Sequence, residues 1–227
     1  LYVNSTGAEG VAIGANALDA NTTGNNNVGI GYSSLGVNTT GGSNVAVGSY
    51  ALDANTTANN NVAVGHHALG ANTTGSENTA VGKSSLATIT TGAYCTAVGF
   101  NTLNLNTVNS NVAVGYAALA ANSTGTPNTA VGTYALDANT TGAANTAIGY
   151  ATLTVQTTTS NNTAVGNSAL SVTTGANNTA VGAYALDANS TGANNTAFGE
   201  GALGGNTTAS YNTAVGQGAM YVNSTGA

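Results

Sequence analysis

A short repeat runs along the whole chain and constrains the fold more than any other feature. A segment of the type Asn-Thr-Ala-Val-Gly recurs 13 times in the 227 residues, and consecutive copies are 17 residues apart except for two spacings of 16. A period this short fits one coil of a parallel β-solenoid, in which coils stack at about 4.8 Å. The glycines that end the copies are Gly14, Gly31, Gly48, Gly65, Gly82, Gly99, Gly115, Gly132, Gly149, Gly166, Gly182, Gly199 and Gly216.

The repeat predicts an all-β fold, a parallel β-solenoid (β-roll) of about 13 coils of 17 residues over residues 1–227. Because side chains alternate along a strand, we expect the outer residues of Thr/Val-Ala-Val/Ile to point inward and the Ala outward. A second strand is expected around Ala-Leu, with Leu inward. The glycine and the Asn-Thr-Thr-Gly segment are expected to form corners.

The two ends of the chain carry nearly the same sequence. Leu1–Ala8 matches Met220–Ala227 in seven of eight places, so the chain starts and stops in the same phase of the repeat. We therefore expect residues 1–227 to form a single repeat domain that is a segment of a longer repeat protein. Alternatively, neighbouring subunits of a fibre cover the ends.

The composition excludes several classes of function. The chain has 1 Lys+Arg and 7 Asp+Glu, a net charge of −6, and its charged fraction is only 4%. One basic residue cannot neutralise a nucleic-acid backbone or form a polybasic membrane anchor. No apolar run approaches the roughly 18 residues of a transmembrane helix, so no direct membrane insertion is expected. Asn and Thr number 34 and 38, and both are poor helix formers.

The repeat resembles that of a known class of surface proteins. Gly10–Gly14 and Asn61–Gly65 are similar to the Ser-Val-Ala-Ile-Gly head repeats of trimeric autotransporter adhesins, and the pattern also resembles Asn-Thr-Ala-Val-Gly repeats of tail-fibre and surface-fibre proteins. The resemblance implies a left-handed β-roll, self-association as a trimer or filament, and a location outside the cell or on a cell or virion surface.

Asparagine recurs at the predicted corner, where two interpretations are open. Thirteen Asn-x-Ser/Thr sequons are present, three of them, Asn161, Asn177 and Asn194, away from the corner. The corner residues form either a ladder of stacked amides or a set of N-glycosylation sites on a fibre surface. These residues are Asn4, Asn21, Asn38, Asn55, Asn72, Asn122, Asn139, Asn189, Asn206 and Asn223.

Threonine and tyrosine supply the other candidate contact surfaces. The second Thr of the corner pair forms a candidate surface rank, meaning a column of equivalent side chains on successive coils, comprising Thr23, Thr40, Thr57, Thr74 and Thr141. Such ranks also occur on ice-binding solenoids, although usually as Thr-x-Thr on a strand. Tyrosine follows the repeat glycine and is a candidate contact for other solenoids or glycans. These tyrosines are Tyr32, Tyr50, Tyr116, Tyr134, Tyr150 and Tyr184.

Few residues suggest catalysis or metal binding. His66 and His67 are expected on opposite faces of a strand, which makes a poor metal site. The recurrent Asp19, Asp53, Asp137 and Asp187 are at least two coils apart, too far for one calcium ion, and are expected to be solvated or to cap turns. Cys95 has no basic neighbour that would activate it.

No Ser-His-Asp set, paired carboxylates or phosphate loop is evident. We therefore expect no enzyme, no catalytic or metal residues and no cofactor. The predicted function is that of an extracellular structural fibre or adhesin repeat region that self-associates, contacts glycans and displays a repetitive polar surface, itself a candidate for glycosylation. Ice binding through Thr and Asn ranks is the alternative.

Overall fold

The chain divides into two compact units, Leu1–Asn111 and Val112–Ala227, of which the computed structural model describes residues 4–223. The matching end segments therefore lie partly outside the described residues. Within residues 4–223 every regular element is a three-residue β-strand and no helix occurs. The first unit contains β1 (Val11–Ile13), β2 (Val28–Ile30), β3 (Val45–Val47), β4 (Val62–Val64), β5 (Thr79–Val81) and β6 (Thr96–Val98). The second contains β7 (Val112–Val114), β8 (Thr129–Val131), β9 (Thr146–Ile148), β10 (Thr163–Val165), β11 (Thr179–Val181), β12 (Thr196–Phe198) and β13 (Thr213–Val215).

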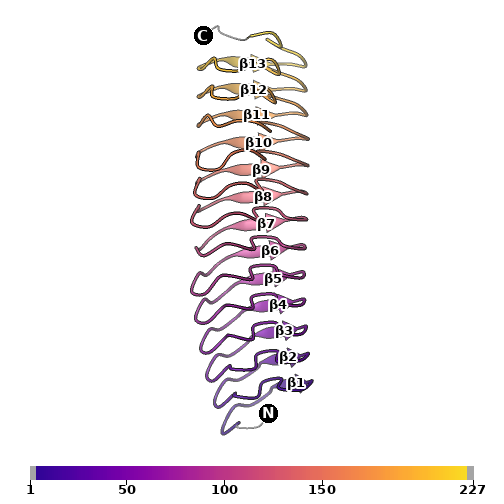
Figure 1. Ribbon diagram of the computed structural model, residues 1–227, viewed down its shortest axis with the longest axis vertical. Helices are drawn as coiled ribbons and strands as arrows, with labels where there is room; N and C mark the ends of the chain where they lie inside the picture. The colour runs from indigo at the N-terminus through magenta and orange to yellow at the C-terminus, as the bar shows by residue number, and fades with distance from the viewer. Residues whose placement is uncertain (1–3, 224–227) are drawn as a thin grey trace. The chain divides into compact units, whose positions relative to one another are not determined.

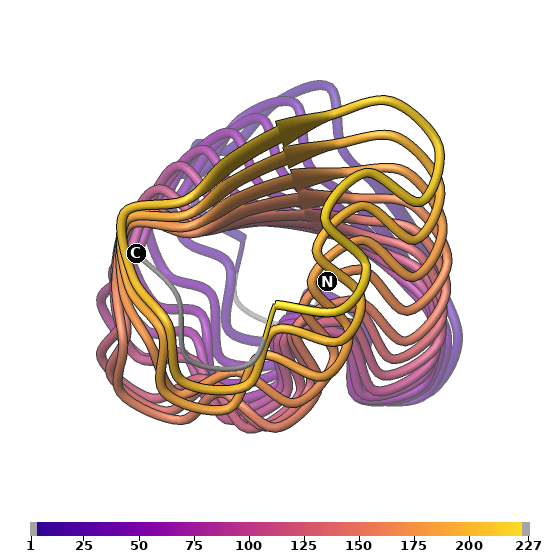
Figure 2. The ribbon, with the colours of Figure 1, turned by 90° about the horizontal axis from the view of Figure 1, so that it is seen from above.

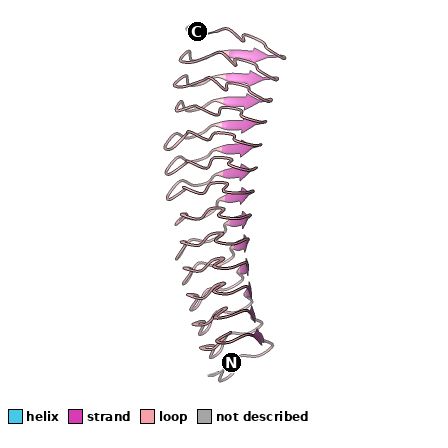
Figure 3. Ribbon diagram, turned by 45° about the vertical axis from the view of Figure 1, so that its right-hand side comes forward, coloured by secondary structure: helices cyan, strands magenta, loops and turns pink. Residues whose placement is uncertain are grey.

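Within each unit, each strand pairs in parallel with the strand one repeat away (Figure 1). The register follows the repeat residue for residue, as in the pairing of Ala46 with Ala63 in the first unit. One strand per coil and loops elsewhere make each unit a β-solenoid (Figure 3). These pairings confirm the predicted all-β parallel solenoid.

The 16-residue spacing in the second unit leaves the strands in register. Thr163 pairs with Thr179 and Val165 with Val181, although these partners are only 16 residues apart. The shortened coil compensates in the corner, where Thr173 is followed by one threonine before Gly175 instead of the usual two residues. The parallel strand pairing therefore keeps its register, and the missing residue is taken from the corner.

The direction of the strand side chains is opposite to the prediction. The central Ala of the strand is buried in coil after coil, including Ala46 and Ala130 at 0% exposure, whereas its neighbours are half-buried or exposed. The prediction that Ala points outward is therefore wrong. The interior is tight even for a methyl group: a Cβ built on Gly29, which replaces this Ala in β2, would lie 3.2 Å from Leu18 Cγ.

The segment around Ala-Leu is a turn, so the predicted second strand is also wrong. The leucine has a positive φ in each described coil, for example 51° at Leu52, and so does the residue two positions earlier, for example 60° at Tyr50. A strand requires negative φ at each residue, so these left-handed residues bend the chain. The preceding glycine has φ +133° at Gly48, where an added Cβ would lie 2.6 Å from the carbonyl oxygen of Gly65.

The inward direction of the leucines is confirmed. Leu18 is 1% exposed, and its equivalents in the later coils, from Leu35 to Leu203, are fully buried. Each contributes about 1.5–3 kcal/mol of hydrophobic stabilisation. Viewed along the stack, the strands of each unit lie along one side of the coil and the turns form the other sides (Figure 2). The leucines and the strand alanines thus form the apolar part of a thin core.

Candidate functional site

The corner asparagines lie inside the coil and form a hydrogen-bonded ladder. In the first unit, Asn38 Nδ2 donates to Asn21 Oδ1 at 2.9 Å, and Asn55 Nδ2 donates to Asn38 Oδ1 at 2.8 Å. In the second unit, Asn139 Nδ2 donates to Asn122 Oδ1 at 2.8 Å. The buried members, all at most 3% exposed, are Asn21, Asn38, Asn55, Asn72, Asn122, Asn139, Asn189 and Asn206.

This burial leaves no room for a glycan on these eight side chains in the folded coil. The Nδ2 atom that a glycan would occupy already donates to a carbonyl three residues on, at 2.9 Å between Asn38 and Gly41. At the ends of the described chain, Asn4 is exposed and Asn223 is half-buried. The exposed sequons within the second unit are instead Asn161, Asn177 and Asn194.

A second asparagine ladder lies beside the first, and the sequence analysis did not identify it. Its residues precede each strand: the backbone N–H of Asn44 donates to Asn27 Oδ1 at 3.0 Å, and Asn61 repeats this bond with Asn44. The sequence signal was the near-invariant Asn before each strand. The buried members are Asn27, Asn44, Asn61, Asn78, Asn111, Asn128, Asn145, Asn162, Asn178, Asn195 and Asn212.

Cys95 takes one place in this second ladder. It is buried, and its Sγ donates to the carbonyl of Val108 at 3.2 Å. Desolvation by burial raises the pKa of the Cys95 thiol. The same stretch of chain replaces a member of the first ladder by the buried Ile89. Because the thiol is enclosed and protonation is favoured, Cys95 fills space rather than presenting a reactive thiolate.

The two corner threonines have different roles. The first donates its hydroxyl to the next coil, as in Thr22 Oγ1 to the carbonyl of Thr39 at 2.9 Å. Serine can do the same, and Ser123 and Ser190 take this place with bonds of 3.0 and 2.9 Å. The second threonine is exposed at all five predicted rank positions, Thr23, Thr40, Thr57, Thr74 and Thr141, and also at Thr91, Thr124, Thr158, Thr191 and Thr208.

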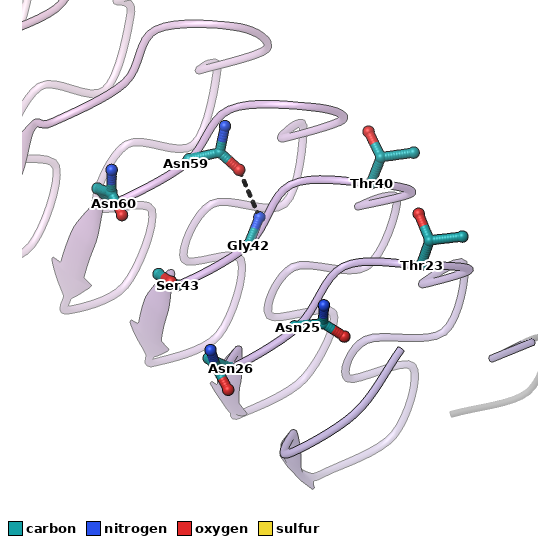
Figure 4. A pocket seen from close by; sticks show the side chains of 8 residues that line it. All are labelled: Thr23, Asn25, Asn26, Thr40, Gly42, Ser43, Asn59 and Asn60. Atoms are coloured by element: carbon teal, nitrogen blue, oxygen red, sulfur yellow. Dashed lines mark hydrogen bonds between the residues drawn. The ribbon is translucent and has the colours of Figure 1, made fainter. Parts of the chain in front are cut away.

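The exposed threonine rank borders a polar groove in the first unit (Figure 4). The groove has a volume of about 430 Å³ and is lined by Thr23, Thr40 and the side chains between this corner and the strands. Asn59 Oδ1 accepts the backbone N–H of Gly42 at 2.7 Å and so fixes one wall. The lining contains hydroxyl and amide groups and no ionisable side chain.

Aromatic side chains form a ridge on the turn after the repeat glycine. In the first unit the rings of Tyr32 and Tyr50 meet edge to face at 5.2 Å, and Tyr50 stacks on His67 at 4.8 Å. In the second unit Tyr116 and Tyr134 meet at 5.3 Å, and a hydrogen bond with Tyr116 raises the pKa of Tyr134. Tyr150 and Tyr184 are exposed, so the six predicted tyrosines are exposed or, for Tyr50, half-buried.

The histidine pair does not divide between two faces. His66 and His67 lie on a turn, and their ring centroids are only 4.3 Å apart. The expectation of opposite faces is wrong because it assumed a strand. Among residues 4–223, no group of three or more His, Cys, Asp or Glu could hold a metal ion.

All four recurrent aspartates, Asp19 included, are half-buried. Desolvation raises the pKa of the carboxyl groups of Asp53, Asp137 and Asp187. At Asp53 the charge of His67 and two backbone hydrogen bonds oppose this rise. One oxygen, Oδ1, of Asp53 and of Asp137 is buried without a hydrogen-bond partner. Of the two predicted roles, a freely solvated charge does not fit these three carboxylates, whereas turn capping stays open because each has backbone hydrogen bonds at its own residue and the next.

The chain matches no protein-family model and no curated protein sequence. No helix in the described part of the chain is long and apolar enough to cross a membrane. The candidate sites are therefore the surfaces described above. These are the strand residues on either side of the buried Ala, the threonine rank, the aromatic ridge and the half-buried aspartates.

Proposed function

We propose that the chain is a non-enzymatic structural repeat region of an extracellular fibre or adhesin, and that it self-associates as a trimer or filament. The observation that carries this proposal is the outward strand face, defined as the first and third residues of the strands in each unit. Ile13 is 59% exposed, Ile148 40% and Phe198 55%. Exposed apolar side chains that repeat along a face are typical of an interaction surface.

The occupant of this face is a second copy of the same chain. None of the 13 strands carries a charged residue, so two such faces meet without repulsion. The acidic groups that give the net charge of −6 lie outside the strands, which leaves them in water when the faces pack. The adhesin and tail-fibre resemblance of the repeat supports the same assembly.

Self-association is tested on the purified chain by light scattering and negative-stain microscopy. We expect the wild type to form oligomers or filaments, and Val131→Lys with Ile148→Lys on the strand face to abolish them. Thr141→Lys, on the exposed corner, is the matched control and should still assemble. A wild type that stays monomeric at all concentrations, or variants that assemble alike, would contradict the proposal.

Glycosylation is part of the proposal for the exposed sequons only. N-glycans would attach at Asn4, Asn161, Asn177 and Asn194, since the buried ladder amides are already hydrogen-bonded. Intact mass of material from the native source measures this directly. A mass equal to the unmodified 21.7 kDa argues against a glycan coat and leaves the structural role in place.

Ice binding is a second candidate, favoured by the outward threonines of the second unit. Six successive strands, β8 to β13, begin with Thr, and each Thr is half-buried or exposed beside an outward residue that is Val, Ile or Phe. A regular array of hydroxyl and methyl groups with no charge is the surface expected of an ice-binding solenoid. Thermal hysteresis that Thr146→Lys with Thr163→Lys removes would support ice binding, and its absence in the wild type at micromolar concentration would exclude it.

A further inference from the structure

The segment Tyr-Ala-Leu-Asp occurs three times and places a tyrosine beside a half-buried carboxylate each time. The copies are Tyr50–Asp53, Tyr134–Asp137 and Tyr184–Asp187. In each, the buried Leu anchors the turn from inside, and the tyrosine has a φ of 57–60°. The two polar ends of the segment are thereby held on the outside of the coil at a fixed separation.

Two of the copies line similar grooves in different units. Tyr50 and Asp53 line a groove of about 330 Å³ in the first unit. Tyr184 and Asp187 line one of about 310 Å³ in the second. Both lie at the lower end of the roughly 300–1,000 Å³ of small-molecule sites. The third copy, Tyr134–Asp137, repeats the same segment, and its carboxylate is likewise half-buried.

Glycines line these grooves beside the tyrosine, Gly36 in the first groove and Gly201 and Gly218 in the second. The remaining lining includes a second acidic residue in each groove, Asp19 in the first and Glu200 in the second. It also includes Asn16, Ser33 and Gln217, which offer amides and a hydroxyl. No Lys or Arg lines either groove, so the sites have no group that would pair with a phosphate, sulfate or carboxylate of a ligand.

The chemistry of the tyrosine and the aspartate, which recur at the two ends of each segment, points to one class of ligand. A tyrosine ring offers an apolar face with a polar tip, on which the C–H face of a sugar ring can stack. A carboxylate that is partly desolvated accepts hydrogen bonds from hydroxyl groups strongly. A calcium ion is a poor alternative because it needs six to eight oxygen ligands, whereas each groove brings two carboxylates. Within residues 4–223 no group of three or more His, Cys, Asp or Glu could hold a metal ion.

We propose that each Tyr-Ala-Leu-Asp segment is a binding site for one uncharged hexose unit of a glycan. The ring of Tyr50, Tyr134 or Tyr184 stacks on the sugar, and the aspartate three residues later accepts a hydrogen bond from one of its hydroxyl groups. This inference deepens the adhesin part of the proposed function by naming its ligand class. Three weak sites along the chain would act together on a polymeric glycan through avidity.

The test uses the full chain and neutral tetrasaccharides of glucose, mannose and galactose, with saturation-transfer NMR and tyrosine fluorescence, which is unobscured because the chain has no Trp. We expect at least one tetrasaccharide to bind and the triple variant Tyr50→Ala, Tyr134→Ala, Tyr184→Ala to lose at least tenfold in affinity. The triple aspartate-to-asparagine variant should lose several-fold. Tyr94→Ala with Tyr211→Ala is the matched control, because both tyrosines are exposed and neither has an aspartate three residues later.

Three results would overturn the proposal. The first is no binding of any neutral tetrasaccharide at millimolar concentration. The second is equal binding by the tyrosine triple variant and the control. The third is binding of tetralysine in place of the sugars, with loss at 0.5 M NaCl, which would assign the grooves to a cationic partner. Microscopy of the tyrosine triple variant separates this test from the proposed function, since filaments depend on the strand face and should persist.

Discussion

The side-chain amide of Asn38 donates to Asn21 Oδ1 and to the carbonyl oxygen of Gly41, both at 2.9 Å. The same carbonyl accepts a second hydrogen bond from Asn27 Nδ2 at 2.7 Å. The two asparagine ladders therefore converge on one corner carbonyl that no strand partner reaches. Asparagine suits this place because its amide has two donors and an acceptor on a short side chain.

Breaking one ladder residue should destabilise the first unit. Asn55→Ala removes the Nδ2 bonds to Asn38 Oδ1 and to the carbonyl of Ala58, and leaves Asn72 Nδ2 without its Asn55 acceptor. Each buried polar group left unsatisfied costs about 1–3 kcal/mol, so we expect the free energy of unfolding to fall by about 2–5 kcal/mol. Urea denaturation measures the change. Thr57→Ala, an exposed neighbour, should stay within about 0.5 kcal/mol of wild type, and equal losses would contradict the ladder.

Restoring a missing ladder residue should stabilise the second unit. Gln156 stands where the ladder has Asn, and Asn139 Oδ1 is consequently buried without a partner. Gln156 bonds instead to Thr159 and Asn162. Gln156→Asn places the side-chain amide at the same distance from the backbone as in the other ladder members. From there its Nδ2 can donate to Asn139 Oδ1. We expect a gain of about 0.5–1.5 kcal/mol in urea denaturation, and a loss would show that the bond between Gln156 and Asn162 matters more.

The sequence predicted the solenoid and the buried leucines because both follow from periodicity, which one chain displays 13 times. The predicted direction of the strand side chains was wrong because the size and hydrophobicity of Val and Ile suggested that they fill the core. In fact Leu18 and its equivalents already occupy the narrow interior, so only Ala fits opposite them. The turn at Leu52 was missed for another reason: a left-handed leucine is rare, so propensity argued against it. The grooves could not be predicted because they depend on side chains from several coils.

The reversed strand direction leads to a clear mutational asymmetry. Ala130→Val adds two methyl groups to the filled interior, and we expect the free energy of unfolding to fall by about 1–3 kcal/mol. Val131→Thr, on the exposed side of the same strand, should change it by about 0.5 kcal/mol or less. Thermal unfolding of the two variants side by side tests this. The opposite order would restore the direction that the sequence suggested.

Adjacent alanines in the second unit should respond oppositely to glycine. Ala144 has a φ of 54°, which costs an L-residue about 1–2 kcal/mol relative to the right-handed region, whereas Ala143 is not among the residues with positive φ. Ala144→Gly should therefore raise the free energy of unfolding by up to about 1 kcal/mol. Ala143→Gly should lower it by about 0.5–1 kcal/mol through the entropy of the unfolded chain. Destabilisation by both variants would contradict a strained turn.

The half-buried aspartates should make the fold more stable in acid than at neutral pH. Desolvation raises the pKa values of Asp53, Asp137 and Asp187 above their ordinary value of 3.8. The folded chain therefore binds more protons than the unfolded chain between pH 3.8 and the raised values, so stability falls as pH rises through that window and is greatest below it. Urea denaturation from pH 3 to pH 7 should show this decline, and the triple aspartate-to-asparagine variant should flatten it. Repeating the series at high salt is the control, because salt screens general charge repulsion and does not remove a burial penalty. A stability that rises from pH 3 to pH 7 would show that hydrogen bonds to these carboxylates outweigh their desolvation.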